Sequence, residues 1–450
     1  MAALRCIFFF SLFSSCLAAT YVMFPMFGRS HYLVIAKVGE ELSRRGHEVQ
    51  IFVGNTETYA LKSPLARPFN SSHGLKKIGK PGAGLYALMS HLATVQAFYC
   101  DDILGNNDVM KAVKHADLVV GDSLDMCGSL IADSTPTAHA FALPLSPAYV
   151  PQFQSTLTDK LNFVERIQNV YQWIVVYLTF HIGMAPPFKE LKNRYNITPD
   201  RSLYETLVKV DLIIAQMGFF LEYPRLFCRV NTRVVGPLLT SPSKPLPAEL
   251  EEFMQSSGDN GVIVVAFGTA LTTLNRDILA VMASAFAKFP QKFIWKLNEA
   301  ESSAISVSDN IKAVPWMPQN DILGHPKTRL FIGHAGLNGI LESIYHGVPM
   351  ICSPFFGDQF DNAQAARDAG FAEVLHLGKA TAEQLVSVIN TVLTDPSYRE
   401  SAVRISKSIN SCLVRLLKKP LIGWSTRRLK VVCSTSDRGV WIYHSTSFTF

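Results

Sequence analysis

The stretch from Trp316 to Asn362 decides the fold of the second half of this chain, WMPQNDILGHPKTRLFIGHAGLNGILESIYHGVPMICSPFFGDQFDN. Its short apolar run Arg329–Gly333 predicts a buried strand, and the segment after His334-Ala335-Gly336 predicts a helix that stops near Gly347. A helix that opens beyond a parallel strand directs free N–H groups and the positive end of its dipole at the crevice. The stretch therefore predicts an α/β sheet with a diphosphate-sized anion site at a strand end.

Aromatic and polar side chains are placed around this predicted anion site. Trp316 and Gln319 are three residues apart, so the indole can stack on a flat base while the amide contacts its polar edge. Asn338 and Glu342 are four residues apart and share one helical face. Gly336 has no side chain and lets the backbone approach phosphates closely. These residue types in this order indicate a nucleotide site.

A further polar pair follows the next apolar run, Val348–Pro354. Asp358 and Gln359 therefore lie at the carboxyl end of a second predicted strand. Parallel strands present these ends to the same crevice. A carboxylate accepts hydrogen bonds and an amide both accepts and donates them, which suits the hydroxyls of a sugar. The whole stretch is thus typical of a site for a nucleotide sugar.

Three motifs of the stretch resemble the donor-binding motifs of the UDP-glycosyltransferases, and are most similar to the animal, UDP-glucuronosyltransferase-like branch. They are W-x-x-Q from Trp316, H-A-G-x-N-G-x-x-E from His334 and G-D-Q-F-D-N from Gly357. The resemblance extends from about Tyr21 to about Asn410. It implies a GT-B fold, α/β, with two Rossmann-like doubly wound parallel-sheet domains facing a cleft. It also implies inverting, metal-independent transfer of a hexosyl or glucuronosyl group from a UDP-sugar to a hydroxyl of a small lipophilic acceptor.

The resemblance also implies which residues hold the UDP-sugar, which is a co-substrate and not a resident cofactor. The tryptophan and glutamine of the first motif would hold uracil, the histidine with a hydroxyl-bearing residue the diphosphate, the glutamate the ribose, and the Asp–Gln pair the sugar. Carried over to this chain, the donor residues are Thr269, Trp316, Gln319, His334, Gly336, Asn338, Gly339, Glu342, Asp358 and Gln359. In one departure from the family pattern, Ala335 stands where the family usually has glycine.

The identity of the sugar stays open between two indications. The family's galactose users often carry histidine at the position of Gln359, which favours UDP-glucose or UDP-glucuronate here. The passage Leu145–Pro151 instead resembles the ceramide-galactosyltransferase side of the animal branch.

The catalytic base is expected in the first half of the chain. The acceptor oxygen must lose its proton as it attacks, and a side chain that titrates near neutrality suits this role. His31 opens a predicted helix just after the first strand, where the helix dipole favours its neutral form. A carboxylate would stabilise the imidazolium; Asp122, at a strand end, is the first choice, and Asp125 and Asp117 are the alternatives. The resemblance places the family's His–Asp dyad on His31 and Asp122.

The beginning of the chain is typical of a secretory signal. Residues 1–19 combine Arg5, an apolar run Cys6–Leu17 and a small-residue cleavage site, Cys16-Leu17-Ala18-Ala19. Cleavage removes two of the eight cysteines, and the remainder are scattered without a C-x-x-C pair. This spacing predicts neither a zinc site nor a disulfide framework. Asn70 and Asn196 begin glycosylation sequons, which matter in the secretory route.

Composition and charge bound the domains and the partners. The 450 residues, 48% hydrophobic, suffice for two domains, expected at 20–240 for the acceptor and 259–410 for the UDP-sugar, joined by a linker at 241–258. The net charge of +6 comes from the divergent, basic end, residues 411–450, which holds seven Lys/Arg against one acid. The positive and negative charges of the remaining residues are equal in number, so no nucleic-acid-binding surface is expected.

The end of the chain leaves alternatives for function and for membrane contact. No apolar window from 411 onward reaches the roughly 18 residues of a spanning helix, so we expect a protein of the endoplasmic reticulum lumen. Basic residues in 411–450 could hold the protein to anionic lipid. The aromatic segment Tyr171–Met184 predicts core packing; the alternatives are an acceptor pocket or a membrane-surface patch.

For function, an active transferase is favoured over a weak, truncated isoform that pairs with related enzymes as a regulatory partner. A UDP-sugar epimerase is disfavoured.

Overall fold

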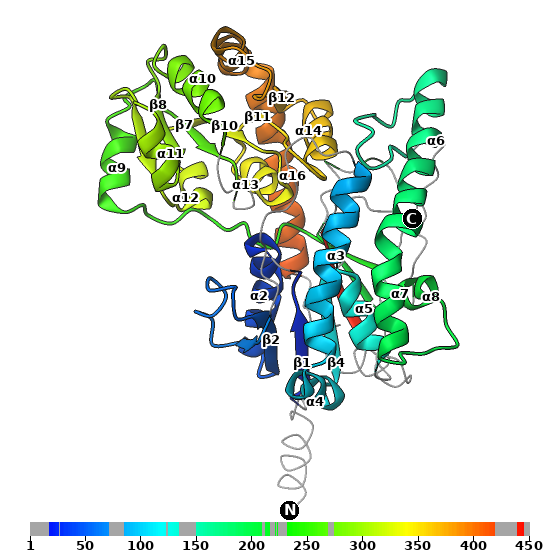
Figure 1. The fold of residues 1–450 in the computed structure, drawn as a ribbon. Coiled ribbons are helices and arrows are strands. Elements are labelled where there is room, and N and C mark those ends of the chain that lie inside the picture. The colour runs from blue at the N-terminus through cyan, green and yellow to red at the C-terminus, as the bar shows by residue number, and fades with distance from the viewer. Residues whose placement is uncertain are drawn as a thin grey trace, which may run out of the picture.

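The computed structural model describes residues 18–26, 28–71, 85–122, 125–134, 150–208, 212–216, 221, 223, 232–268, 274–418 and 439–444. Two parallel sheets, each with helices packed on it, build two α/β domains side by side (Figure 1). This arrangement confirms the predicted fold class. Most of the predicted signal 1–19, most of the Leu145–Pro151 passage and most of the basic end 411–450 lie outside the described residues.

The first sheet has the strand order β3-β2-β1-β4-β13-β5-β6. Its strands are β1 (Thr20–Phe24), β2 (Glu48–Gly54), β3 (Ala66–Phe69), β4 (Leu118–Asp122), β5 (Leu212–Gln216), β6 (Thr232–Val235) and β13 (Gly439–His444). Its helices are α2 (Arg29–Arg44), α3 (Leu85–Leu104), α4 (Asn107–His115), α5 (Met126–Asp133), α6 (Phe163–Leu178), the π-helix η1 (Thr179–Met184), α7 (Ala185–Arg194) and α8 (Leu203–Val208). Strand β13 pairs in parallel with β4 and β5, so the divergent end of the chain contains a strand that the sequence did not predict.

The second sheet has the strand order β12-β11-β10-β7-β8-β9. Its strands are β7 (Val262–Ala266), β8 (Lys292–Lys296), β9 (Ile311–Val314), β10 (Thr328–Gly333), β11 (Met350–Cys352) and β12 (Ala372–Val374). Its helices are α9 (Ala248–Gln255), α10 (Arg276–Phe286), α11 (Glu299–Ala304), α12 (Gln319–Leu323), α13 (Leu337–Tyr345), α14 (Gln359–Asp368), α15 (Ala382–Thr394) and α16 (Pro396–Lys418). Helix α9 lies within the predicted linker 241–258, and α16 continues past residue 411.

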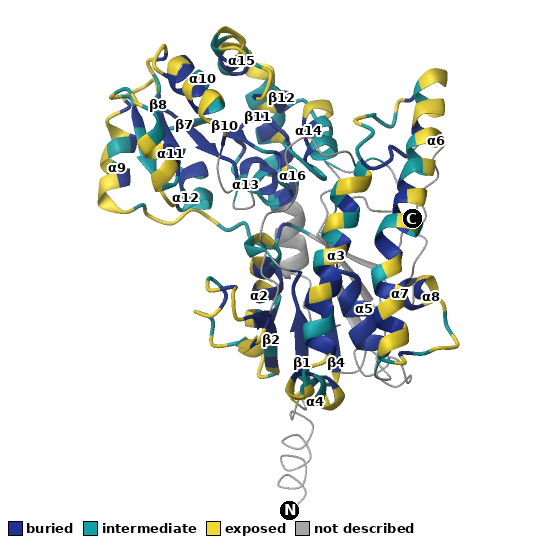
Figure 2. Ribbon diagram, viewed as in Figure 1, coloured by how far each residue is buried: buried dark blue, intermediate teal, exposed yellow. Residues whose placement is uncertain are grey.

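The inner described strands of both sheets, such as β1 and β7, are buried on both faces, because helices cover each side. Along β7, Val262 and Val264 pack into one hydrophobic core while Ile263 and Val265 pack into another. Successive side chains of a strand point to opposite faces, so a run of apolar residues fills two cores at once. Figure 2 shows strands such as β1, β4 and β7 buried, and the outward faces of the helices exposed.

A disulfide between Cys100 of α3 and Cys127 of α5 corrects the sequence prediction, which indicated no disulfide framework. The two Cα atoms lie 5.3 Å apart although the residues are separated by 27 positions. Cysteine spacing alone did not reveal it, because the partners lie on different helices. The disulfide ties the helix that follows β4 to the core of the first domain.

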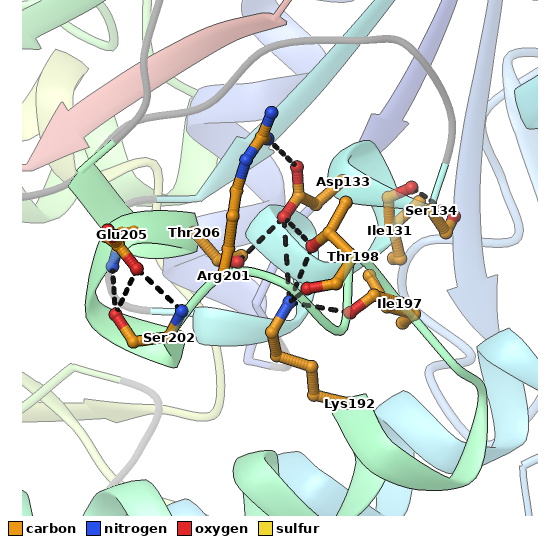
Figure 3. Close-up of polar contacts among 10 residues, drawn as sticks. All are labelled: Ile131, Asp133, Ser134, Lys192, Ile197, Thr198, Arg201, Ser202, Glu205 and Thr206. Carbon is orange, nitrogen blue, oxygen red and sulfur yellow. Dashed lines mark hydrogen bonds and ion pairs between the residues drawn. The ribbon is translucent and has the colours of Figure 1, made fainter.

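A buried polar network also fixes α5 (Figure 3). At the end of α5, Asp133 accepts hydrogen bonds from Thr198 (2.5 Å) and Thr206 (2.7 Å), and Arg201 lies 3.1 Å from its other oxygen. The Lys192 ammonium donates to the carbonyls of Ile197 and Thr198. Buried charges are tolerated when they are paired and hydrogen-bonded in this way. The network joins α5 to α7 and α8.

Candidate functional site

The carboxyl end of the first sheet brings His31 and Asp122 together. Gly28 has φ 110°, a conformation that favours glycine, and it lets the chain turn from β1 into α2 so that His31 lies in the first turn. Asp122 ends β4, the neighbour of β1 in the sheet. The His31 Nδ1 and the Asp122 Oδ2 are 2.8 Å apart, and Asp122 is 1% exposed. The geometry is that of a base whose tautomer is fixed by a buried carboxylate.

Charges from both domains act on the His31 ring. Burial alone lowers the pKa of His31, but the charge and hydrogen bond of Asp122, with smaller contributions from Asp358 and Asp125, outweigh it and raise the pKa. Asp358 precedes α14 of the second domain. The two halves therefore meet electrostatically at this histidine.

Asp125, an alternative partner for His31, is the N-cap residue of α5 instead. It caps α5 by accepting a hydrogen bond from the backbone N–H of Cys127 at 3.0 Å. Burial, with a smaller contribution from the charge of Asp122, raises its pKa to about 7. The carboxylate in contact with the His31 ring is that of Asp122.

The predicted base- and ribose-binding residues lie around α12 and α13 of the second domain. Trp316 is 58% exposed, so its indole face is open to a stacking partner. Gln319 donates a 2.5 Å hydrogen bond to Glu342, which joins two residues that the sequence placed in separate motifs. Burial raises the pKa of Glu342 to about 7.

The predicted anion site lies at the N-terminus of α13. Gly336 is the N-cap residue, and no side chain caps the helix there. The His334 ring lies between Gly268 and Gly336, since a Cβ built on either glycine would come within 2.6 and 2.5 Å of it. Ala335 adopts φ 60°, a left-handed conformation that suits the glycine usual in the family. Thr269 lies outside the described residues.

His334 is neutral at physiological pH. Burial, and then the positive charge of Lys296, lower its pKa to about 4. A neutral imidazole donates a hydrogen bond to a phosphate without adding a charge.

Lys296 is a candidate that the sequence reasoning missed. It ends β8, and its ammonium donates to the Gly268 carbonyl at 2.8 Å. Burial, and then the charge of Arg29 from the first domain, lower the pKa of this lysine. The available signal in the sequence is a lysine directly after the apolar run Phe293–Trp295.

The predicted sugar-binding pair begins α14. The Gln359 side-chain oxygen accepts hydrogen bonds from the backbone N–H groups of Phe355 and Phe356, at 2.9 and 3.2 Å. Asp358 accepts a hydrogen bond from Asn362, yet burial raises its pKa to about 6. The oxygen of Gln359 is thus engaged by its own loop, and its amide N–H groups are the part suited to a ligand.

Two further motif residues lie on α13. Asn338 is partly buried in its first turn. Gly339 faces β10, since a Cβ at this position would lie 3.4 Å from the Phe331 ring. Among the described residues, no group of three or more His, Cys, Asp or Glu side chains could hold a metal ion.

Comparison with known proteins shows the family of this chain. A family model described as "UDP-glucoronosyl and UDP-glucosyl transferase" matches residues 76–411. The chain is 32% identical over 438 residues to human UDP-glucuronosyltransferase 2A2, covering 87% of this chain and 80% of that protein. It is 31% identical over 423 residues to UDP-glucuronosyltransferase 2B19 of Macaca fascicularis, covering 84% and 78%.

Solved structures of similar fold are glycosyltransferases. The glycosyltransferase of kitacinnamycin superposes with a TM-score of 0.65 at 16% identity, over 88% of this chain and 96% of that one. A UDP-glucose:anthocyanidin 3-O-glucosyltransferase in complex with UDP superposes with a TM-score of 0.62 at 17% identity, over 92% and 99%. These likenesses show the GT-B fold.

Proposed function

Since this chain belongs to the UDP-glycosyltransferase family, we propose that it moves a hexosyl or glucuronosyl group from a UDP-sugar to a hydroxyl of a small lipophilic acceptor, with inversion and without a metal. The observation that carries the proposal is the 2.8 Å contact between His31 and Asp122, with Asp358 of the donor domain within electrostatic range. The proposed base, His31, and the proposed sugar-binding carboxylate, Asp358, thereby come from different domains.

The reaction is a single displacement. The Nδ1 of His31 lies against Asp122, so Nε2 is the nitrogen that takes the proton from the acceptor hydroxyl. The acceptor oxygen attacks the anomeric carbon, and the bond to the UDP oxygen breaks on the opposite side. Asp122 stabilises the imidazolium that forms.

The departing UDP is stabilised by groups of the second domain. The uncapped N-terminus of α13 presents free N–H groups to the diphosphate, and neutral His334 donates one more hydrogen bond. Lys296 supplies the positive charge that His334 lacks. This set makes a divalent cation unnecessary for charge neutralisation.

The test is UDP release from a panel of UDP-sugars, with and without phenol, sterol and sphingolipid acceptors, in the presence of EDTA. We expect acceptor-dependent release with UDP-glucose or UDP-glucuronate, and EDTA should not change the rate. Release that no acceptor stimulates would contradict transfer, and loss of activity in EDTA would contradict the metal-independent mechanism.

Stacking on Trp316 is the basis of a prediction for donor binding. Trp316→Ala should weaken UDP and UDP-sugar alike by about 1–3 kcal/mol, the scale of base–aromatic stacking. Calorimetric titration with both ligands measures the change. Trp173→Ala in the first domain is the control and should leave UDP affinity unaltered. Weakening of the UDP-sugar alone would assign Trp316 to the sugar.

We further propose that helix α6 lies on the luminal surface of the endoplasmic reticulum membrane. The predicted signal and the disulfide both fit the oxidising secretory route. Among the described residues, no helix is long and apolar enough to span a bilayer. Contact by a surface helix would bring the enzyme to lipophilic acceptors that partition into the membrane.

Helix α6 carries an apolar stripe, which is defined by eight exposed side chains. They are Phe163, Val164, Ile167, Val170, Tyr171, Ile174, Tyr177 and Leu178. At 100° per residue the stripe faces away from the buried Asn169 and Val176, so it points outward from the core. It contains no charged residue, and Phe163 is 77% exposed. Figure 2 shows α6 exposed at its outer end. Part of the segment Tyr171–Met184 is core, as predicted, while this stripe is surface.

The stripe predicts membrane binding that does not depend on salt. The chain should float with neutral phosphatidylcholine vesicles at low and high salt, because an apolar face inserts without charge attraction. The double substitution Ile167→Glu with Tyr171→Glu should abolish flotation, and Gln168→Glu at the edge of the stripe is the control. Binding only to anionic vesicles at low salt would assign attachment to the basic end of the chain. Self-association without vesicle binding would assign the stripe to a second copy.

The site favours an active transferase over the regulatory-partner alternative. A histidine in contact with a buried carboxylate and an uncapped helix N-terminus beside His334 are both present. Nothing in the described part of the chain supports the alternative.

A further inference from the structure

A loop of the first domain is hydrogen-bonded to α14, the helix that begins with the proposed sugar-binding pair Asp358 and Gln359. The clamp loop, residues 152–157, reaches Asp361 in the first turn of α14. The backbone N–H of Gln154 donates to one Asp361 oxygen at 2.7 Å, and that of Thr156 points at the other at 3.4 Å. The Gln154 amide also donates to the Gly357 carbonyl at 3.3 Å. These contacts join positions more than 200 residues apart.

The clamp loop adopts an unusual backbone to make these contacts. Gln154 has φ 58° and Thr156 has φ 53°. Left-handed conformations are disfavoured for residues other than glycine, and most of all for a β-branched residue such as threonine. Such conformations persist where the surroundings compensate for them. Here they direct two backbone N–H groups at one carboxylate, which forms a charge-assisted pair.

The other side of the clamp loop is fixed to the first domain. Asn169 of α6 accepts a hydrogen bond from the Gln152 N–H at 2.8 Å, and Gln172 donates to the Phe153 carbonyl at 2.8 Å. The Phe153 side chain is buried in the core of the first domain. The loop is therefore a rigid arm and transmits the position of its domain to Asp361.

A second contact between the domains holds the far end of α14. The Tyr223 hydroxyl donates to Asp368 at 2.6 Å. This contact lies about two helical turns from Asp361 and away from the sugar-binding pair. It offers a matched comparison, because it joins the same helix to the first domain without touching the turn that carries Asp358 and Gln359.

We propose that Asp361 is a positioning residue that locks the clamp loop onto α14 and so fixes Asp358 and Gln359 in register with His31. This inference rests on the proposed function. Loss of the lock would leave the UDP moiety bound at Trp316, Gln319 and Glu342, which lie elsewhere in the second domain. It would misplace the sugar relative to the base, and such displacements are costly for reaction rate.

The test compares Asp361→Asn with Tyr223→Phe. Asp361→Asn keeps the shape and removes the charge, and kcat should fall by about 100-fold, as for a misplacement of about 1 Å. The dissociation constant of UDP should stay within about twofold, and Tyr223→Phe should lose far less activity. Thr156→Gly should retain activity, because glycine keeps the N–H that faces Asp361 and adopts the left-handed conformation freely.

A distance measurement makes the inference independent of activity. Spin labels on Lys160→Cys and Lys379→Cys, both exposed and on opposite domains, report the relation between the domains. Asp361→Asn should broaden the distribution of distances between the two labels or increase its mean. This result is expected even if the wild-type chain transfers no sugar. An unchanged distance would overturn the inference. So would an unchanged kcat in an active enzyme, or parallel losses of UDP binding and kcat.

Discussion

His31→Ala is expected to remove nearly all sugar transfer while leaving UDP affinity nearly intact. The ring lies in the first domain, against Asp122, and the motif residues that we propose bind UDP lie in the second. General base catalysis contributes about 10²–10⁴-fold to rate, so the loss in kcat should fall in this range. Steady-state kinetics with UDP binding measured in parallel separates the two effects.

The control for this variant is His115→Ala, which alters an exposed histidine at the end of α4 in the same domain. It should leave both kcat and UDP affinity at wild-type values. Equal losses of UDP binding and turnover in His31→Ala would place His31 in the donor site instead.

Asp122→Asn is expected to cost less than loss of His31 and to move the acid limb of the pH–rate profile. Removing the charged partner of a hydrogen bond should cost about 1.5–3 kcal/mol of transition-state stabilisation. The base must be neutral, so activity falls as the pH drops through the pKa of His31. The Asp122 charge raises that pKa above 6.5 against the effect of burial. Without the charge, burial dominates and the acid limb should shift to lower pH.

Asp125→Asn tests whether Asp122 is the correct partner. The amide oxygen of asparagine can still cap α5, so structure and most of the activity should survive. Asp125 also raises the pKa of His31, but less than Asp122 does. Its removal should therefore shift the acid limb less. A larger loss of activity in Asp125→Asn than in Asp122→Asn would show that the assignment of Asp122 is wrong.

The local elements of this protein could be predicted from the sequence. The apolar run Arg329–Gly333 predicted a strand, and the structure has β10 at Thr328–Gly333. The run Val348–Pro354 predicted a second strand, and the structure has β11 at Met350–Cys352. Short-range patterns suffice here, because periodicity and turn residues act over a few positions. The motif from His334 also predicted the helix N-terminus at Gly336, which α13 shows.

Only the tertiary structure decided which distant residues meet. Asp122 is preferred to Asp125 as the partner of His31, 91 positions away, because β4 pairs with β1 while Asp125 turns to cap α5. Cys100 meets Cys127 across two helices.

The tertiary structure also decided the contacts of three side chains whose partners the sequence did not predict. Lys296 approaches Gly268 from a neighbouring strand end, and the Gln359 oxygen is engaged by its own loop. Asp361 is held by a loop of the other domain. Sequence patterns fix which face of an element is buried. The pairing of particular side chains depends on how strands order within a sheet and how two domains pack, and these are set by the summed contacts of the whole chain.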